Sequence, residues 1–368
     1  MSENKMSETK LESKATIRAK ERGYFETNKE WYAQFNYTTL KGDIGYEKGV
    51  LRRDPSSVIE VEGVYYVWYT RSVGDVEGFI PGRPEAKVFP WDYSEVWYAT
   101  STDGYEWKEQ GIAVGRGEKG SYDDRSVFTP EILVHEGRYY LTYQVVQSPY
   151  LTRVKEHIGM AVADTVTGPF RKLDAPILYT ADNGKWDGEE DDHFKTKTKG
   201  DFDSHKVHDP SLHFFNKKFY LYYKGERLGE EMYGGGREIK WGVAIADEIT
   251  GPYIKSPYNP ITNSGHETCL WEYEGGMAMM LTSDGFERNT MQYAKDGINF
   301  DIMGVVGRLN VNPHAAGPFR PNEPNFKKPL DGINWGLHMV SADWDYIERF
   351  DLDENMKIPY YEKDNRKG

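Results

Sequence analysis

Two aspartates of this sequence occupy the same short context. Asp54 follows an arginine and Asp209 follows a histidine, both precede Pro-Ser, and each lies about ten residues before a run of aromatic residues. An aspartate before proline is common in turns, so one such motif has little weight. Its repetition before two similar runs predicts a repeated structural unit with an acidic side chain at a fixed corner.

Three similar signatures precede other apolar runs, and they are Thr129-Pro130-Glu131, His266-Glu267-Thr268 and Asn322-Glu323-Pro324. If the fold brings all the signatures together, carboxylates and histidines meet in one place. Glycoside hydrolysis uses paired carboxylates in a concave site, one as acid and one as base or nucleophile, with pKa values separated by burial and mutual repulsion. The signatures therefore favour a glycosidase over a set of unrelated turns.

The elements that must position these residues are short strands. Five runs alternate aromatic or apolar residues with a period of two, at residues 63–69, 137–143, 217–223, 275–281 and 333–339. The first four are followed by a run rich in small residues, at 96–101, 158–163, 241–246 and 290–295. Asp-Gly hairpin dipeptides and two Thr-Gly-Pro-aromatic turns, at 167–170 and 250–253, close the units.

Five repeats of three or four short strands, with almost no helical periodicity after residue 50, predict an all-β fold, a five-bladed β-propeller. A β-sandwich is the rival fold, but it does not explain the matched second strands and the repeated Gly-Pro turns. The innermost strand of each propeller blade runs along the central channel, so residues at its start converge on one mouth. We therefore expect the five signatures to form one site.

The beginning of the chain differs from the rest. We expect a short helical N-terminal segment, residues 1–45, followed by a propeller catalytic domain, residues 46–368. Residues 11–22 have a weak apolar stripe, many charges and a terminal Gly23 suited to a helix C-cap, and a second short helix is expected over 27–35. Such a stripe cannot pack a core alone, so the segment must dock on its own propeller or on a partner.

A charged insert at residues 181–205 precedes the third blade. Its length and polarity suit a loop at the mouth of the site and suit a disordered surface loop equally well.

Composition narrows the function classes. The net charge of −13 argues against nucleic-acid binding, and no apolar run is long enough for a transmembrane helix. The first residues lack the apolar core of a secretory signal, so a cytoplasmic location is expected, or a periplasmic one if a signal has been removed. Because Cys269 is the only cysteine, intramolecular disulfides and a Cys-based zinc site are excluded.

The chain resembles glycoside hydrolase family 117, the α-1,3-(3,6-anhydro)-L-galactosidases or neoagarobiose hydrolases. The SxAxxR motif of that family's N-terminal segment is matched by Ser13, Ala15 and Arg18. Its catalytic-domain pattern is matched by Asp54, Asp209 in an HDPS setting, and the pair His266-Glu267. The resemblance covers almost the whole chain.

This resemblance implies an exo-acting enzyme that cleaves the α-1,3 bond at the non-reducing end of neoagarobiose and neoagaro-oligosaccharides. The product is 3,6-anhydro-L-galactose, and the reaction proceeds with inversion. By analogy Asp54 is the general base, His266 is the general acid, and Asp209 tunes the acid and orients the substrate. The implied sugar contacts are Trp91, Thr129, Glu131, Gln144, His208 and Glu267, with Trp97 as an alternative to Trp91 for the stacking wall.

The resemblance also implies a homodimer that exchanges the helix bearing Ser13, Ala15 and Arg18. No cofactor is expected, although a structural divalent cation stays open. A metal site has no HxH or HExxH spacing to support it, and its candidate ligands are His208, Asp209, His266 and Glu267. Two other functions stay open. One is an arabinan- or xylan-cleaving propeller glycosidase with Glu267 as the acid, and the other is a non-catalytic carbohydrate-binding propeller.

Overall fold

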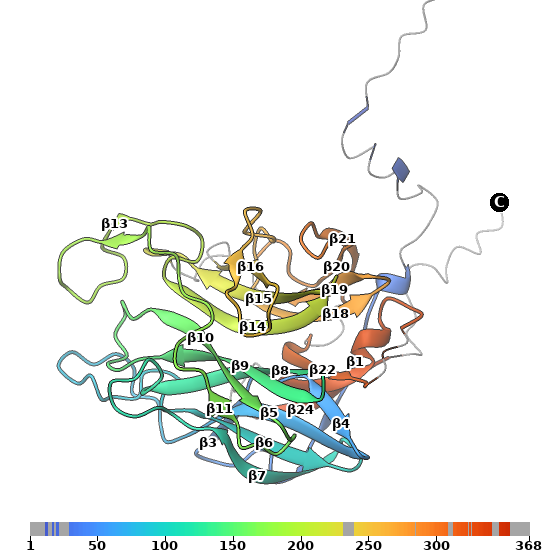
Figure 1. The fold of residues 1–368 in the computed structure, drawn as a ribbon, viewed down its shortest axis with the longest axis horizontal. Helices are drawn as coiled ribbons and strands as arrows, with labels where there is room; N and C mark the ends of the chain where they lie inside the picture. The colour runs from blue at the N-terminus through green and yellow to red at the C-terminus, as the bar shows by residue number, and fades with distance from the viewer. Residues whose placement is uncertain are drawn as a thin grey trace, which may run out of the picture.

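The computed structural model describes residues 12–13, 17, 20–21, 29–230, 239–283, 285–307, 312–322, 324, 326–340 and 346–353. From residue 29 onward, the helical elements it describes are the 3-10 turns η1 (Lys29–Trp31) and η2 (Asp331–Ile333), and the prediction of an all-β fold is confirmed (Figure 1). No helix in the described part of the chain is long and apolar enough to cross a membrane.

The predicted helix at 11–22 lies largely outside the described residues, as do Ala15 and Arg18 of the SxAxxR motif. Ser13 is described, and its carbonyl accepts a hydrogen bond of helical spacing from the backbone N–H of Ile17 (3.0 Å). The second helix, predicted over 27–35, is wrong for the described residues, because only the turn η1 forms before the chain enters a strand.

Consecutive strands pair into antiparallel meanders. In the first, β3 (Val50–Arg53) and β4 (Val58–Val61) both pair with β5 (Val64–Val73), followed by β6 (Glu95–Ser101) and β7 (Glu106–Val114). The second contains β8 (Ser126–His135), β9 (Arg138–Val146), β10 (Glu156–Ala163) and β11 (Arg171–Lys172). The third contains β14 (Lys206–Phe215), β15 (Lys218–Glu226), β16 (Ile239–Ala246) and β17 (Ile254–Lys255).

The next meander contains β18 (Glu267–Tyr273), β19 (Gly276–Thr282), β20 (Thr290–Ala294) and β21 (Asp301–Val305). The last contains β22 (His314–Arg320), β23 (Trp335–Met339) and β24 (Ile347–Leu352), and it is completed by β1 (Phe35–Thr39). Three short strands lie outside the meanders: β2 (Lys41–Gly42) pairs with β7, and β12 (Lys185–Trp186) pairs with β13 (Thr196–Thr198) inside the charged insert.

The first strands of the meanders form a ring that closes where the two ends of the chain meet. Strand β14 contacts β8 and β18, β18 contacts β22, and β22 pairs in parallel with β4. In Figure 1 the orange and red end of the chain lies against the blue beginning. Closure requires Gly317, because a Cβ there would overlap the backbone carbonyl of Ser56. The result is the arrangement of a β-propeller.

The sequence misplaced the strands relative to the signatures. The aromatic runs are the second strands β5, β9, β15, β19 and β23, whereas most signatures lie within or directly beside the innermost strands. A β-bulge at Phe128/Glu131 admits Pro130 in the middle of β8, and one at His208/Ser211 admits Pro210 in β14. The two prolines therefore interrupt the period-two pattern in the sequence, although the strands continue through them.

The fifth signature, 322–324, is wrong as the start of an inner strand. Its described residues Asn322 and Pro324 follow β22, which begins at His314. The strand sequence His-Ala-Ala-Gly-Pro-Phe-Arg contains no alternation of large apolar and polar residues, so a period of two cannot reveal it.

The many tyrosines serve mainly to pack the meanders. Tyr69, Tyr222 and Tyr223 are completely buried, and each hydroxyl donates to a partner, respectively Glu109 (2.7 Å), the Gly297 carbonyl (2.7 Å) and Asp203 (2.8 Å). Buried tyrosine is stable where its ring is packed and its hydroxyl is bonded. The aromatic content therefore builds the scaffold, and only some rings lie at the site.

Candidate active site

A cavity of about 570 Å³ collects nearly all the residues that the sequence singled out. Its volume is typical of a site for a small organic ligand. The predicted residues on its wall are Asp54, Trp91, Thr129, Gln144, His208, Asp209, His266 and Glu267. Trp97, the alternative stacking residue, is not part of this wall and packs with Arg71, whose guanidinium lies 4.1 Å from its ring centre.

The backbone places three of these side chains in the same way. Asp54, Thr129 and Asp209 have φ values of 50°, 47° and 50°, in the left-handed region that residues other than glycine rarely adopt. Each precedes a proline, and for Thr129 and Asp209 the position coincides with a bulge, which redirects a strand side chain. The strained conformation costs on the order of 1–3 kcal/mol per residue and aims the side chains at the cavity.

Asp54 is held by a two-pronged contact with its neighbour. Arg53 donates from Nε to Oδ2 (2.8 Å) and from Nη2 to Oδ1 (3.0 Å), and the Thr129 hydroxyl donates to Oδ2 (3.4 Å). Both members of the pair are 5% exposed. A carboxylate offers about four acceptor positions, so these contacts leave one on Oδ1. Asp54 is thus fixed in orientation and retains an acceptor position for a water molecule.

Aromatic rings form the wall next to this pair. Trp91 stacks on Phe89 with ring centres 4.6 Å apart, and its indole N–H donates to the Tyr150 hydroxyl (3.0 Å). The guanidinium of Arg53 lies 4.7 Å from the Trp91 ring centre. The aromatic wall is therefore in contact with the Arg53–Asp54 ion pair, and its rings offer an apolar surface on which a ligand can stack.

Asp209, Lys224 and Glu267 form a buried charge cluster. The Lys224 ammonium lies 2.5 Å from Asp209 and 4.0 Å from Glu267, and Lys224 is 3% exposed. Burial raises the pKa of Asp209 to about 6, against the opposing effect of Lys224. Burial acts in the same sense on Glu267, but Lys224 and His266 outweigh it and lower the pKa of Glu267. The two carboxyls therefore differ in their affinity for a proton.

His266 stands at the start of β18 beside Glu267. Its Nε2 lies 3.5 Å from Glu267 Oε1, and its backbone N–H donates to the Ser283 carbonyl (3.3 Å). The preceding Gly265 has a φ of 124°, and a Cβ there would clash with Leu281. Glycine at 265 therefore allows the turn that places the imidazole on the cavity wall.

A second charge network supports His208 and Gln144. Lys206 bridges Glu156 (3.4 Å) and Glu226 (3.2 Å), and Glu226 lies 3.5 Å from His208 Nε2. The Gln144 amide donates to Glu156. Burial lowers the pKa of His208, and nearby Lys224 adds to this effect, so His208 is neutral at physiological pH.

Lys224, Lys206, Glu226 and Glu156 were all missed by the sequence analysis. A signal was present, because charged residues stand at the ends of strands whose other residues are apolar, as in the run Tyr-Tyr-Lys-Gly-Glu of β15. Charges buried in this way are paired, and paired buried charges cluster at functional sites.

Glu131 is a predicted sugar contact that does not line this cavity. It lines a smaller cavity of about 40 Å³, which Asp54, Thr129, Asp209 and Glu267 also line. There Glu131 accepts a hydrogen bond from the Ser57 backbone N–H (3.2 Å) and lies 3.3 Å from Arg320. Among the described residues, no group of three or more His, Cys, Asp or Glu side chains is arranged to hold a metal ion.

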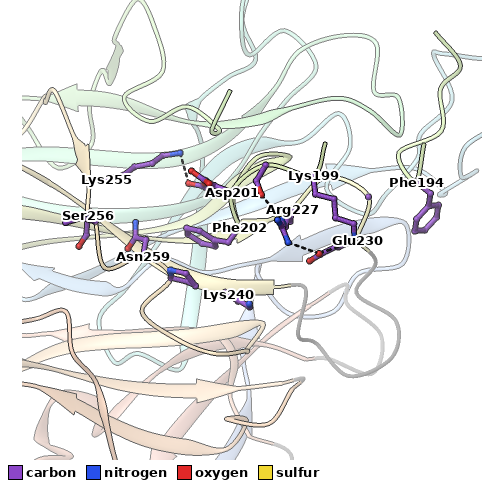
Figure 2. Close-up of a pocket in the computed structure, with 15 residues that line it drawn as sticks. Phe194, Lys199, Asp201, Phe202, Arg227, Glu230, Lys240, Lys255, Ser256 and Asn259 are labelled. Carbon is purple, nitrogen blue, oxygen red and sulfur yellow. Dashed lines mark hydrogen bonds and ion pairs between the residues drawn. The ribbon is translucent and has the colours of Figure 1, made fainter. Parts of the chain in front are cut away.

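A polar groove of about 1000 Å³ adjoins the 570 Å³ cavity and shares Arg227 and Glu230 with it (Figure 2). The Arg227 side chain donates to the Gly200 carbonyl (2.7 Å) and to Glu230 (3.3 Å), and Lys199 lies 3.2 Å from Glu230. The charged insert thus contributes to the groove as well as to the cavity.

Comparison with known proteins places this geometry in a family. No protein-family model and no curated protein matches the chain. A solved structure that does match is Zg3597, a family 117 glycoside hydrolase of the marine bacterium Zobellia galactanivorans, with 36% identity, a TM-score of 0.70, and coverage of 90% of this chain and 94% of that one.

More distant structures share the fold alone. One described as a glycoside hydrolase has 13% identity and a TM-score of 0.58 over 94% of this chain and 97% of its own. The GH43_1 enzyme of Xanthomonas citri complexed with xylose has 13% identity and a TM-score of 0.51, over 82% of this chain and 87% of its own. Because the 36% identity to Zg3597 extends over nearly the full length of both chains, this protein belongs to glycoside hydrolase family 117.

Proposed function

We propose that this glycoside hydrolase cleaves the α-1,3 bond at the non-reducing end of neoagarobiose and neoagaro-oligosaccharides. It releases 3,6-anhydro-L-galactose with inversion of the anomeric centre. The observation that carries the proposal is the meeting of Asp54, Asp209 and His266 on the wall of one cavity, although they are far apart in the sequence.

In the proposed mechanism Asp54 is the general base. Its remaining acceptor position on Oδ1 takes a proton from water, and the oxygen of that water forms a bond to the anomeric carbon. The bond from this carbon to the leaving oxygen breaks on the opposite face of the sugar, which gives inversion. An inverting site needs space for this water, and its acid and base stand roughly 6.5–9.5 Å apart.

His266 supplies the proton to the leaving oxygen. His266 is placed for this role because it lines the cavity and its Nε2 lies 3.5 Å from Glu267, a carboxylate that can hold the ring in position. Asp209, paired with Lys224, orients the substrate and contributes negative charge to the acid's surroundings. Neutral His208, Gln144 and Thr129 are suited to bond sugar hydroxyls, and Trp91 to stack on the ring.

The direct test is incubation of the protein with neoagarobiose, followed by chromatography for 3,6-anhydro-L-galactose and NMR of the anomer formed first. Release of the anhydro sugar with the inverted anomer supports the proposal. No release over hours, or the retained anomer, refutes the activity or the inversion respectively.

The second candidate is an arabinan- or xylan-type glycosidase in which Glu267 is the acid. Glu267 favours it because the carboxyl shares the cavity with Asp54 and is 7% exposed. We expect His266→Ala to lower kcat by about a hundredfold or more, the usual contribution of a general acid, and Glu267→Gln to be less severe. His135→Ala, at the far end of β8, is the control. The reverse order, together with cleavage of aryl arabinofuranosides, would establish the second candidate.

Three finer points belong to the same proposal. The meanders are the five blades of a propeller. The enzyme works without a cofactor. It is a homodimer that exchanges the N-terminal segment containing Ser13, which light scattering of the full chain and of a variant lacking residues 1–28 would test.

A further inference from the structure

One buried side chain on the cavity wall has an unused hydrogen-bonding atom. His205 is 3% exposed, and its Nε2 has no hydrogen-bond partner among the described residues. Leaving a buried polar atom unpaired costs on the order of 1–3 kcal/mol, so such an atom calls for an explanation. His205 lines the same 570 Å³ cavity, so a bound ligand is the partner to consider for Nε2.

The state of the ring determines what Nε2 can bind. Burial lowers the pKa of His205 to about 3, with Lys206 adding to the effect and Glu226 opposing it. The ring is therefore neutral, and a ring nitrogen of neutral imidazole either donates or accepts one hydrogen bond. A hydroxyl group can do both, so it suits Nε2 in either tautomer.

His205 stands away from the reacting groups. Its backbone N–H donates to the Glu226 carbonyl (2.9 Å), which continues the pairing of β14 with β15. Asp209 lies four residues further along β14, roughly 10–13 Å at the rise of an extended strand, which is longer than one sugar ring. Both residues line the cavity, so it has room beyond the sugar that is cleaved off.

Residues of the charged insert line the outer part of the cavity, beyond Asp209, and hydrogen bonds hold the insert in position. The guanidinium of Arg153 donates to the carbonyls of Asp187 (2.9 Å), Gly188 (2.8 Å) and Asp192 (2.9 Å). The ring of Trp186 packs edge-on against His205 with centres 5.3 Å apart. The insert is therefore an ordered wall of the site. Of the two interpretations of residues 181–205, the structure agrees with the loop at the mouth of the site and not with the disordered surface loop.

From this outer part the path continues into the polar groove of Figure 2. Arg227 and Glu230 line both spaces, and Phe194 and Lys199 of the insert line the groove beyond them. A groove with paired charges, amide groups and one exposed ring offers hydrogen bonds and a stacking surface, as a polyhydroxylated chain requires.

We propose that the cavity beyond Asp209 and the adjoining groove bind the reducing-end part of a saccharide longer than a disaccharide, with His205 Nε2 forming a hydrogen bond to a hydroxyl of a sugar beyond the first two. This inference rests on the proposed function and extends it. The enzyme then prefers longer chains, although it removes one sugar at a time.

The test compares kcat/KM for neoagarotetraose and neoagarobiose. In the wild type we expect a ratio of about ten, the value of one additional well-formed hydrogen bond. His205→Phe keeps a ring against Trp186 but removes the nitrogen that would form the hydrogen bond, and the ratio should fall to about one. His157→Phe is the matched control, because His157 is a partly buried histidine with one backbone contact, from Thr180 N–H (3.4 Å), and it lines neither space; its ratio should stay at about ten.

A wild-type ratio near one overturns the inference without any variant, and so does an unchanged ratio in an active His205→Phe protein. Cleavage of neither sugar would instead refute the proposed function. In that event calorimetry of the wild type with both sugars decides the inference, since tighter binding of the tetrasaccharide supports it and equal or absent binding overturns it.

Discussion

The ammonium of Lys224 opposes the effect of burial on the pKa of Asp209. Replacing Lys224 with methionine tests this interaction. The ammonium lies 2.5 Å from Asp209 and 4.0 Å from Glu267 inside the protein. Methionine keeps most of the side-chain length and removes the charge. Because Lys224 is the main influence that opposes the effect of burial on Asp209, its loss must raise the pKa of Asp209 above the present value of about 6.

The size of the effect follows from the distances. An opposite charge within about 4–6 Å shifts a carboxyl pKa by roughly 1–3 units, so the pKa of Asp209 in Lys224→Met should move from about 6 to about 7–9. With a value near 8, the ionised fraction at pH 7 falls from about 90% to about 10%. If the anionic form is the active one, the acid limb of kcat/KM moves upward by the same interval and activity at pH 7 falls about tenfold.

The assay is kcat/KM on neoagarobiose between pH 5 and pH 9. Lys172→Met is the matched control, because Lys172 lies 2.5 Å from buried Asp123 and outside the catalytic cavity, so its acid limb should not move. An acid limb of Lys224→Met that stays in place or moves to lower pH would show that the charge of Asp209 does not limit activity.

The same pair makes a prediction about stability. The pKa of Asp209 is raised on folding, so this group stabilises the folded state most below about pH 4, and that contribution is lost as pH rises to about 6. In Lys224→Met the pKa of Asp209 is higher, so the stabilisation by its protonated form is lost over a higher pH range. At pH 8 the loss of Lys224 should lower the unfolding free energy by about 1–3 kcal/mol, since each unit by which the pKa of Asp209 rises is worth about 1.4 kcal/mol, and by much less at pH 5, where Asp209 is protonated in both proteins. Urea unfolding at the two pH values measures the difference.

Two further substitutions test other parts of the structure. Asp54→Asn should lower kcat by about a hundredfold or more, the usual contribution of a general base, while circular dichroism keeps the wild-type melting curve; residual activity above a tenth would remove Asp54 from that role. Gly317→Ala should lower the unfolding free energy by about 1–3 kcal/mol or more, because the new methyl group overlaps the Ser56 carbonyl where the ring closes, and an unchanged Tm in calorimetry would contradict the close approach.

The sequence predicted the repeated strands because their aromatic residues alternate. Residues 138–143 and 218–223 lie in β9 and β15, and their side chains are buried from Tyr140 and Phe219 onward. It did not predict the inner strands β8 and β14, because Pro130 and Pro210 interrupt the pattern at bulges that only the partner strand reveals. Nor did it predict that β1 completes the last meander, since this pairing joins residues near opposite ends of the chain.

The sequence predicted the site residues that belong to a local motif. It missed those whose place in the site depends on packing between distant strands. Asp54 and Asp209 are recognisable by their Pro-Ser context. Lys224 has no such context, and its importance follows from its neighbours across two strands, Asp209 on β14 and Glu267 on β18. Glu131 belongs to the Thr-Pro-Glu signature but lines only the smaller cavity, 3.3 Å from Arg320, whereas Thr129 of the same signature lines both cavities.

The backbone of the inner strands explains why a repeated motif pointed to the site at all. Ala315 of β22 has a φ of 43°, the same left-handed conformation as Asp54, Thr129 and Asp209, yet its methyl group can do no chemistry. The strained corner is therefore a feature of the repeating strand, and it persists where no reacting group needs it. Four of the five meanders contain such a corner, at Asp54, Thr129, Asp209 and Ala315, and the identity of the residue there decides whether it can serve as base, as ligand contact or only as structure.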